Sequence, residues 1–145
     1  MNASVEQMYM VGEHGGEPKR IDCAEAVAET GLRGDRHFGS EGSDLTLIAR
    51  EALDAVEREY GIALDPGAHR RNVTVIGADL GALVGERFHV GEAVCLGTEP
   101  CEHCSYLETH LGRADLTEAM AGRGGLRCRI VDGGPIAVGD TLERQ

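Results

Sequence analysis

Two cysteines separated by two residues form the most reactive-looking segment of this sequence. They lie in Thr98–Leu107 (TEPCEHCSYL), where Cys101 and Cys104 enclose Glu102 and His103. A pair with this spacing can bind structural zinc, cycle through a disulfide, or supply one thiolate that carries sulfur or binds a soft metal. It can also be two small residues of a core.

The surrounding sequence favours a single functional thiolate. A structural zinc site needs about four nitrogen or sulfur ligands, and the sequence holds no second Cys-x-x-Cys pair. A thioredoxin-like pair belongs beside a β-α-β pattern, which we do not find. Both remain alternatives. A candidate helix begins at Ser105, and the positive potential of its N-terminus would stabilise a thiolate at Cys104. We therefore predict that Cys104 is the functional thiol.

Arginines in glycine-rich or turn segments form a second candidate site. The chain has thirteen arginines against one lysine. A guanidinium donates two parallel hydrogen bonds, which suits it to phosphate or carboxylate ligands. Solvated loop arginines are the alternative interpretation. The predicted lining of an anion-binding pocket is Arg36, Arg70, Arg71 and Arg123.

Composition limits the class of protein and its partners. The 145 residues suffice for one domain, expected over residues 1–145. A net charge of −11 argues against nucleic acid and anionic membranes as partners. No stretch approaches the roughly 18 apolar residues of a transmembrane helix, and the N-terminus does not resemble a secretory signal. Five cysteines, an odd number, then indicate reduced thiols and a cytoplasmic location.

The elements that must hold these residues are mostly short strands. One amphipathic helix is predicted over 49–60, with Gly61 as its C-terminal cap. Short helices are predicted at 24–29, 105–110 and 116–121, and at most one helical turn at 79–84. Alternation of apolar residues predicts strands at 3–11, 45–48, 72–76, 87–90, 93–96, 126–131 and 136–142.

About seven short strands and few helices predict a mainly β fold, of the barrel-like or α+β kind. The long helices of a doubly wound α/β sheet are missing. Cys95 and Cys128 lie in apolar strand patterns and are expected in the core, whereas the pattern around Cys23 decides nothing.

Taken in order, these motifs resemble the MOSC domain, which is named for the C-terminal domain of molybdenum-cofactor sulfurase. The resemblance runs from about Gly31 to Asp140. The matching segments are Gly34–His37, Leu45–Ile48, Pro66–Gly67, Arg70–Asn72, Gly85–Phe88, Glu99–Cys104, Gly122–Gly125 and Val138–Asp140.

The resemblance implies a β-barrel-like fold and one cysteine that carries sulfur or ligates the molybdenum of a pterin cofactor. The last cysteine of a Cys-x-x-Cys pattern has this role in the family, which assigns both roles to Cys104 here. In relatives that bind the cofactor, an arginine matching Arg70 contacts it. The expected cofactor-binding set is Arg36, His37, Arg70, Arg71, Asn72 and Arg123.

The expected protein is a single-domain, MOSC-like carrier of sulfur or binder of a molybdenum-pterin cofactor, acting through Cys104. Two alternatives remain. One is a molybdenum-dependent reductase of N-hydroxylated compounds, and the other is a non-catalytic binding or carrier module. The expected partners are a small anionic ligand or cofactor and a protein that donates sulfur or electrons.

Overall fold

The computed structural model describes residues 3–10, 12, 18–35, 38–39, 44–62, 71–100 and 125–145. These contain one α-helix, α1 (Arg50–Tyr60), one short 3₁₀ helix, η1 (Leu80–Leu83), and eleven strands. The strands are β1 (Ala3–Met10), β2 (Lys19–Ile21), β3 (Cys23–Val27), β4 (Gly31–Leu32), β5 (Leu45–Ala49), β6 (Val73–Ile76), β7 (Arg87–Val90), β8 (Ala93–Pro100), β9 (Leu126–Asp132), β10 (Gly134–Ala137) and β11 (Thr141–Arg144).

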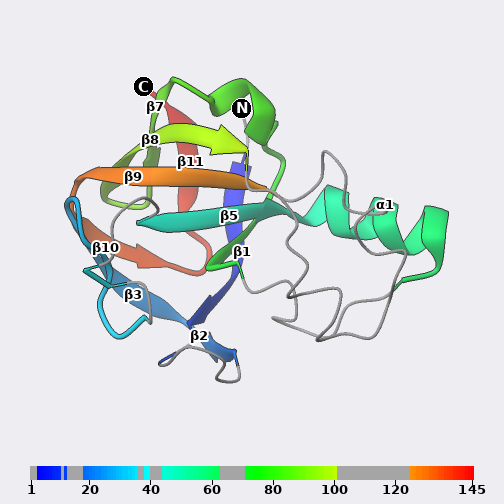
Figure 1. Ribbon diagram of the computed structural model, residues 1–145, viewed down its shortest axis with the longest axis horizontal. Helices are drawn as coiled ribbons and strands as arrows, with labels where there is room; N and C mark the ends of the chain where they lie inside the picture. Colours follow the sequence, from blue (N-terminus) through cyan, green and yellow to red (C-terminus); the bar gives the residue numbers. More distant parts are fainter. Residues whose placement is uncertain are drawn as a thin grey trace.

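Eight of the strands form one sheet that closes into a barrel (Figure 1). Their order is β11-β7-β8-β9-β5-β6-β1-β2, and β11 also pairs with β1, so the seven strands from β11 to β1 make a ring. Within that ring only β5 and β6 run parallel. A parallel pair needs a crossover connection, and α1 lies in it. The remaining strands form a second sheet of order β10-β3-β4.

Apolar side chains from every strand of the ring fill the barrel. In β9, Leu126, Cys128 and Ile130 are buried, whereas Arg127 and Arg129 between them point outward. This alternation is the two-residue period of a strand with one face in the core. Cys95 is fully buried as well, so the predicted core positions of Cys95 and Cys128 are confirmed.

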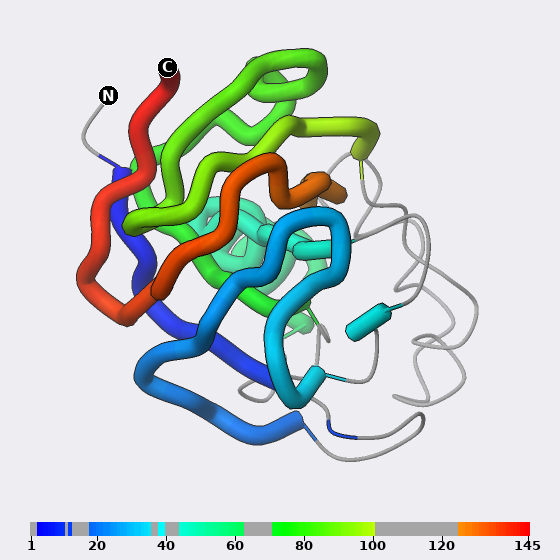
Figure 2. The backbone as a smooth tube through the Cα atoms, turned by 90° about the vertical axis from the view of Figure 1, so that its left-hand side faces the viewer, coloured from blue at the N-terminus to red at the C-terminus, as the bar shows by residue number. Residues whose placement is uncertain are grey.

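The helix α1 extends from one end of the barrel, where Figure 1 shows it beyond the end of β5 and Figure 2 shows it end-on behind the strands. Its amphipathic face buries Val56. Gly61 ends it in the left-handed conformation, with φ of 67°, and donates its N–H to the Glu57 carbonyl, as predicted. Its first turn is tied to the barrel by an ion pair of 2.6 Å between Arg50 Nε and Glu6 Oε1.

Most sequence-based elements are confirmed, and two are wrong. The segment 24–29 was predicted as a helix, but β3 occupies Cys23–Val27. Pairing with β10 and β4 decides this, because five residues are too few to form a stable helix alone. The predicted strand 136–142 is two strands in different sheets, separated by a turn at Gly139, whose φ is 93°. The predicted helices 105–110 and 116–121 lie outside the described residues.

The mainly β, barrel-like fold is therefore confirmed. None of the helices in the described ranges is long and apolar enough to cross a membrane.

Candidate functional site

Four polar side chains lie in one row across the outer face of the barrel. Three of them belong to strands β8, β9 and β5, and the fourth comes directly before β6. The row contains Glu99 of β8, Arg127 of β9, Thr46 of β5 and, just before β6, Asn72. Strand register aligns them, since Glu99 pairs with Arg127 and Arg127 pairs with Thr46. Arg127 Nη1 lies 3.8 Å from Glu99 Oε1, and both side chains are exposed. We call these four residues the polar row.

Asn72 joins β5 to β1 and β6. Its Oδ1 accepts hydrogen bonds of 3.1 Å from the Thr46 N–H and from the Thr46 hydroxyl, and its Nδ2 donates to the Tyr9 carbonyl. The Asn72 N–H donates in turn to Thr46 Oγ1. Asn72 is 5% exposed, so these bonds hold a buried amide at the inner end of the polar row.

The other predicted ligand-binding residues are mostly outside the described residues. This holds for Arg36, His37, Arg70 and Arg123, and also for Cys101 and Cys104. Arg71 is described and, at 7% exposed, is buried beside Asn72. The predicted binding roles of Arg71 and Asn72 therefore stay predictions, as do those of the residues outside the described ranges.

The segment that carries both cysteines is attached to the barrel next to the polar row. It leaves β8 after Pro100 and returns to β9 through Gly125. Pro100 and Leu126 are paired across the two strands, so both ends of the segment meet at one place. In the sequence, Cys104 follows Pro100 by four residues.

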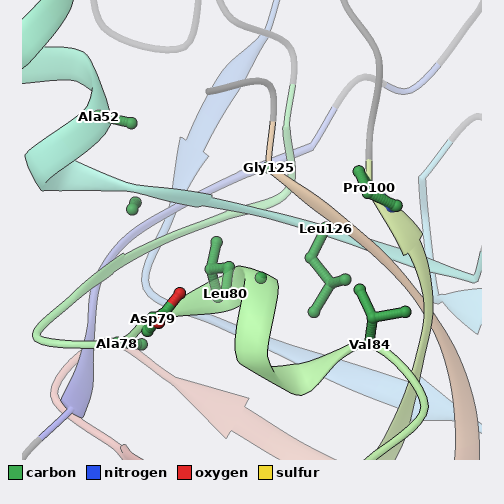
Figure 3. Close-up of a pocket in the computed structure, with 10 residues that line it drawn as sticks. Ala52, Ala78, Asp79, Leu80, Val84, Pro100, Gly125 and Leu126 are labelled. Carbon is green, nitrogen blue, oxygen red and sulfur yellow. The ribbon is translucent and has the colours of Figure 1, made fainter. Parts of the chain in front are cut away.

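A pocket of about 300 Å³ opens at the same end of the barrel, between α1 and η1 (Figure 3). Ala49 and Ala52 line it from the β5–α1 junction, and residues 78–81 with Val84 line it from the η1 segment. The facing ends of β8 and β9 complete the lining with Pro100, Gly125 and Leu126.

Two glycines let the walls of this pocket approach each other. A Cβ atom on Gly97 would overlap the Leu83 carbonyl, and one on Gly125 would overlap the Leu47 carbonyl. At Gly97 the approach is fixed by two hydrogen bonds, in which the Gly97 N–H donates to the Glu86 carbonyl and the Gly85 N–H to the Gly97 carbonyl. The η1 segment is therefore held against β8 by backbone contacts.

Three cysteines, Cys23, Cys95 and Cys128, lie in the described part of the chain, and none of them forms a disulfide. Burial, and to a smaller extent the nearby Asp44 carboxylate, together raise the pKa of the Cys95 thiol to about 12. Asp44 is held in place because its Oδ2 accepts a hydrogen bond of 2.9 Å from the Ile130 N–H. A protonated thiol in the core is a poor nucleophile, so Cys95 has no catalytic role.

No group of three or more His, Cys, Asp or Glu side chains within the described ranges is arranged to hold a metal ion.

Comparison with known proteins decides the family. The sequence profile of the MOSC domain matches residues 34–143, most of the chain. This protein belongs to the MOSC domain family. No curated protein matches it.

Solved structures share the MOSC barrel at low sequence identity. The YUAD protein from Bacillus subtilis superposes with a TM-score of 0.84 at 20% identity, covering 99% of this chain and 96% of that one. YiiM from Geobacillus stearothermophilus gives 0.81 at 18% identity over 99% of this chain and 75% of that one. YiiM from Escherichia coli superposes with a TM-score of 0.78 at 22% identity, covering 100% of this chain and 70% of that one. These likenesses show the fold.

In this MOSC protein, Arg127 ends one of the glycine-rich arginine segments of the sequence, but it was not among the predicted site residues, and the pocket was not predicted. Arg127 is the second residue of a strand with alternating apolar residues. Its side chain therefore lies on the face of the strand opposite to Leu126 and Cys128. Its neighbours Glu99 and Thr46 come from distant parts of the chain, and only the strand register brings them beside it.

Replacing Asn72 by alanine should lower the free energy of unfolding by about 2–3 kcal/mol, because the Thr46 N–H and the Tyr9 carbonyl lose a buried partner. Urea denaturation followed by circular dichroism measures the change. Thr98→Ala is the control, since it removes one exposed hydrogen bond to the Arg127 carbonyl and should change stability by less than about 0.5 kcal/mol. An Asn72 variant as stable as the Thr98 variant would contradict the structural role of this amide.

Proposed function

We propose that this MOSC protein carries sulfur as a persulfide on Cys104, received from a sulfur-donor protein and passed to an acceptor. One observation supports this site above others. The segment that holds Cys104 begins and ends at the paired residues Pro100 and Leu126, directly beside the polar row with the Arg127 guanidinium. A positive charge near a thiol favours its thiolate, the form that accepts sulfur.

The described cysteines support the assignment by contrast. Cys95 and Cys128 are fully buried in the barrel. Cys23 is exposed on β3, which belongs to the second sheet. The side chains of Cys95 and Cys128 lie in the core and Cys23 lies on the other sheet, which leaves Cys101 and Cys104 as the candidate thiols beside the polar row.

The transfer step needs no external oxidant or reductant. The Cys104 thiolate attacks the outer sulfur of the donor's persulfide, a new S–S bond forms, and the donor leaves as a thiolate. An acceptor thiolate removes the sulfur in the same way. Alternatively, the Cys101 thiolate attacks Cys104, forms a disulfide and releases the sulfur as hydrosulfide. In that case the two cysteines are oxidised while the transferred sulfur is reduced.

The described lining of the barrel-end pocket does not fit a molybdenum-pterin cofactor. Its phosphate would require cations, yet the lining of the barrel-end pocket contains the Asp79 carboxylate and, in the described ranges, no lysine or arginine. Arg36, Arg70 and Arg123, which were expected to bind the cofactor, lie outside the described residues. We therefore derive no step through this cofactor.

Loading the protein with inorganic polysulfide tests the proposal. Mass spectrometry should find an added mass of about 32 Da, one sulfur atom, on the peptide that contains Cys104. Cys104→Ala should lose this adduct, whereas the matched variant Cys23→Ala should keep it. An adduct that persists undiminished on the same peptide in Cys104→Ala would refute the assignment.

Metal analysis of the native protein separates the alternatives. Molybdenum with pterin at one equivalent per chain would overturn sulfur carriage and favour a reductase of N-hydroxylated compounds. Neither sulfur loading nor molybdenum would leave a non-catalytic binding module as the better description.

A further inference from the structure

The barrel-end pocket has a lining that suits a ligand of a different kind from the anions expected at Cys104. We infer that it binds a small, mainly apolar molecule carrying a cationic nitrogen group, such as an amine or amidine. This inference does not depend on sulfur carriage.

The size and surface of the pocket favour an apolar ligand. A volume of about 300 Å³ lies at the lower end of the range of small-molecule sites and accommodates one or two rings. Alanine, leucine, valine and proline side chains provide most of the lining. Val84 at its edge is 40% exposed, which is high for a large apolar side chain. A bound ring would remove part of that surface from water.

Charge in the pocket favours a cation. Among the lining residues that the structure describes, Asp79 is the single ionisable one, and Figure 3 shows its carboxylate beside Leu80. Within the described part of the chain, the Asp79 carboxylate has no hydrogen-bond or ion-pair partner. An ammonium or amidinium group would gain a charge-assisted hydrogen bond there. A carboxylate or phosphate would lose hydration and meet repulsion.

The walls of the pocket are already fixed in position. Backbone contacts at Gly97 hold the η1 segment on β8. The other wall is fixed because the Glu51 carboxylate, in the first turn of α1, accepts a hydrogen bond of 2.9 Å from the Gly77 N–H. A site that needs no ordering loses less entropy when a ligand binds.

Three probes of similar shape and different charge test the inference: benzamidine, benzamide and benzoate. Calorimetric or NMR titration at low ionic strength should show benzamidine binding with a Kd of about 1 mM, benzamide more weakly, and benzoate most weakly. Salt should reduce the preference for benzamidine. Benzoate binding as tightly as benzamidine, or no saturable binding of benzamidine below about 10 mM, would overturn the inference.

Matched variants locate the site. Asp79→Asn should weaken benzamidine by about three- to tenfold and leave benzamide unchanged. Asp54→Asn makes the same charge change on an exposed position of α1 outside the lining, and should alter neither. Ala52→Leu should weaken both probes by filling the pocket, whereas Ala82→Leu, exposed and outside the lining, should not. Equal effects of the Asp79 and Asp54 variants would place the probe elsewhere. The polysulfide assay on Asp79→Asn should remain normal, which keeps this test separate from that of Cys104.

Discussion

Replacing Gly97 by alanine should destabilise this protein by about 3–5 kcal/mol, enough to unfold a domain of ordinary stability. The added Cβ would overlap the Leu83 carbonyl carbon and oxygen, which belong to the backbone and cannot rotate away. Relief requires η1 to move off β8, which would break the hydrogen bonds that join Gly97 to Gly85 and Glu86. Urea denaturation followed by far-ultraviolet circular dichroism suits the measurement, because the chain has no tryptophan.

Gly81→Ala is the matched control for this substitution. A Cβ on Gly81 would meet only the Asp79 Oδ1 atom, at an ordinary 3.6 Å. This variant should therefore change stability by no more than about 1 kcal/mol. Similar losses in both variants would mean that the close approach of Gly97 to Leu83 is not what makes glycine necessary there.

The free energy of unfolding should fall as pH rises above about 9. The Cys95 thiol should by itself account for part of this fall. Its thiol has a pKa of about 12 in the folded protein against an ordinary value of 9.0. The folded state therefore keeps this proton where the unfolded chain releases it. Its contribution is fully present below pH 9 and is lost between pH 9 and 12. The slope is about 1.4 kcal/mol per pH unit, and the total is roughly 4 kcal/mol.

Cys95→Ala tests this by removing the titrating group. Its stability should be lower near neutral pH because a buried side chain is truncated, but it should decline less steeply between pH 9 and 10.5. Val94→Ala removes buried atoms from the same strand without a proton, so it should keep the steeper decline of the original protein. If the free energy of unfolding falls equally steeply with pH in both variants, Cys95 does not link folding to pH in this range.

The sequence predicted elements best where the local pattern and the tertiary contacts agree. The helix over 50–60 has an apolar face and a glycine that caps it, and both were readable without the structure. The strand β3 was missed because Ala24 and Glu25 are good helix formers, and only pairing with β10 makes them extended. At 136–142 a single strand was predicted although Gly139 and Asp140 interrupt the apolar alternation, and these two residues lie where the chain turns from one sheet to the other.

The candidate site was less predictable than the fold. Arg71 and Asn72 were selected from the sequence, but the bonds between Asn72 and Thr46 join residues 26 positions apart. Such contacts depend on the register between β5 and β6, which apolar alternation does not determine. The pocket depends on the approach of backbones at Gly97 and Gly125. A glycine in a strand indicates that another backbone segment comes close to it, but not which segment that is.

The pairing of β1 with β11 also constrains the order in which this protein folds. Ala3 pairs with Leu142, and Figure 2 shows the blue and red ends of the chain side by side. During synthesis, β1 leaves the ribosome more than a hundred residues before its partner β11. Until then β1 has an unpaired edge, which can bind strands of other chains. The barrel can close only after translation of this region is complete, so a chaperone that shields the early strands would raise the yield of folded protein.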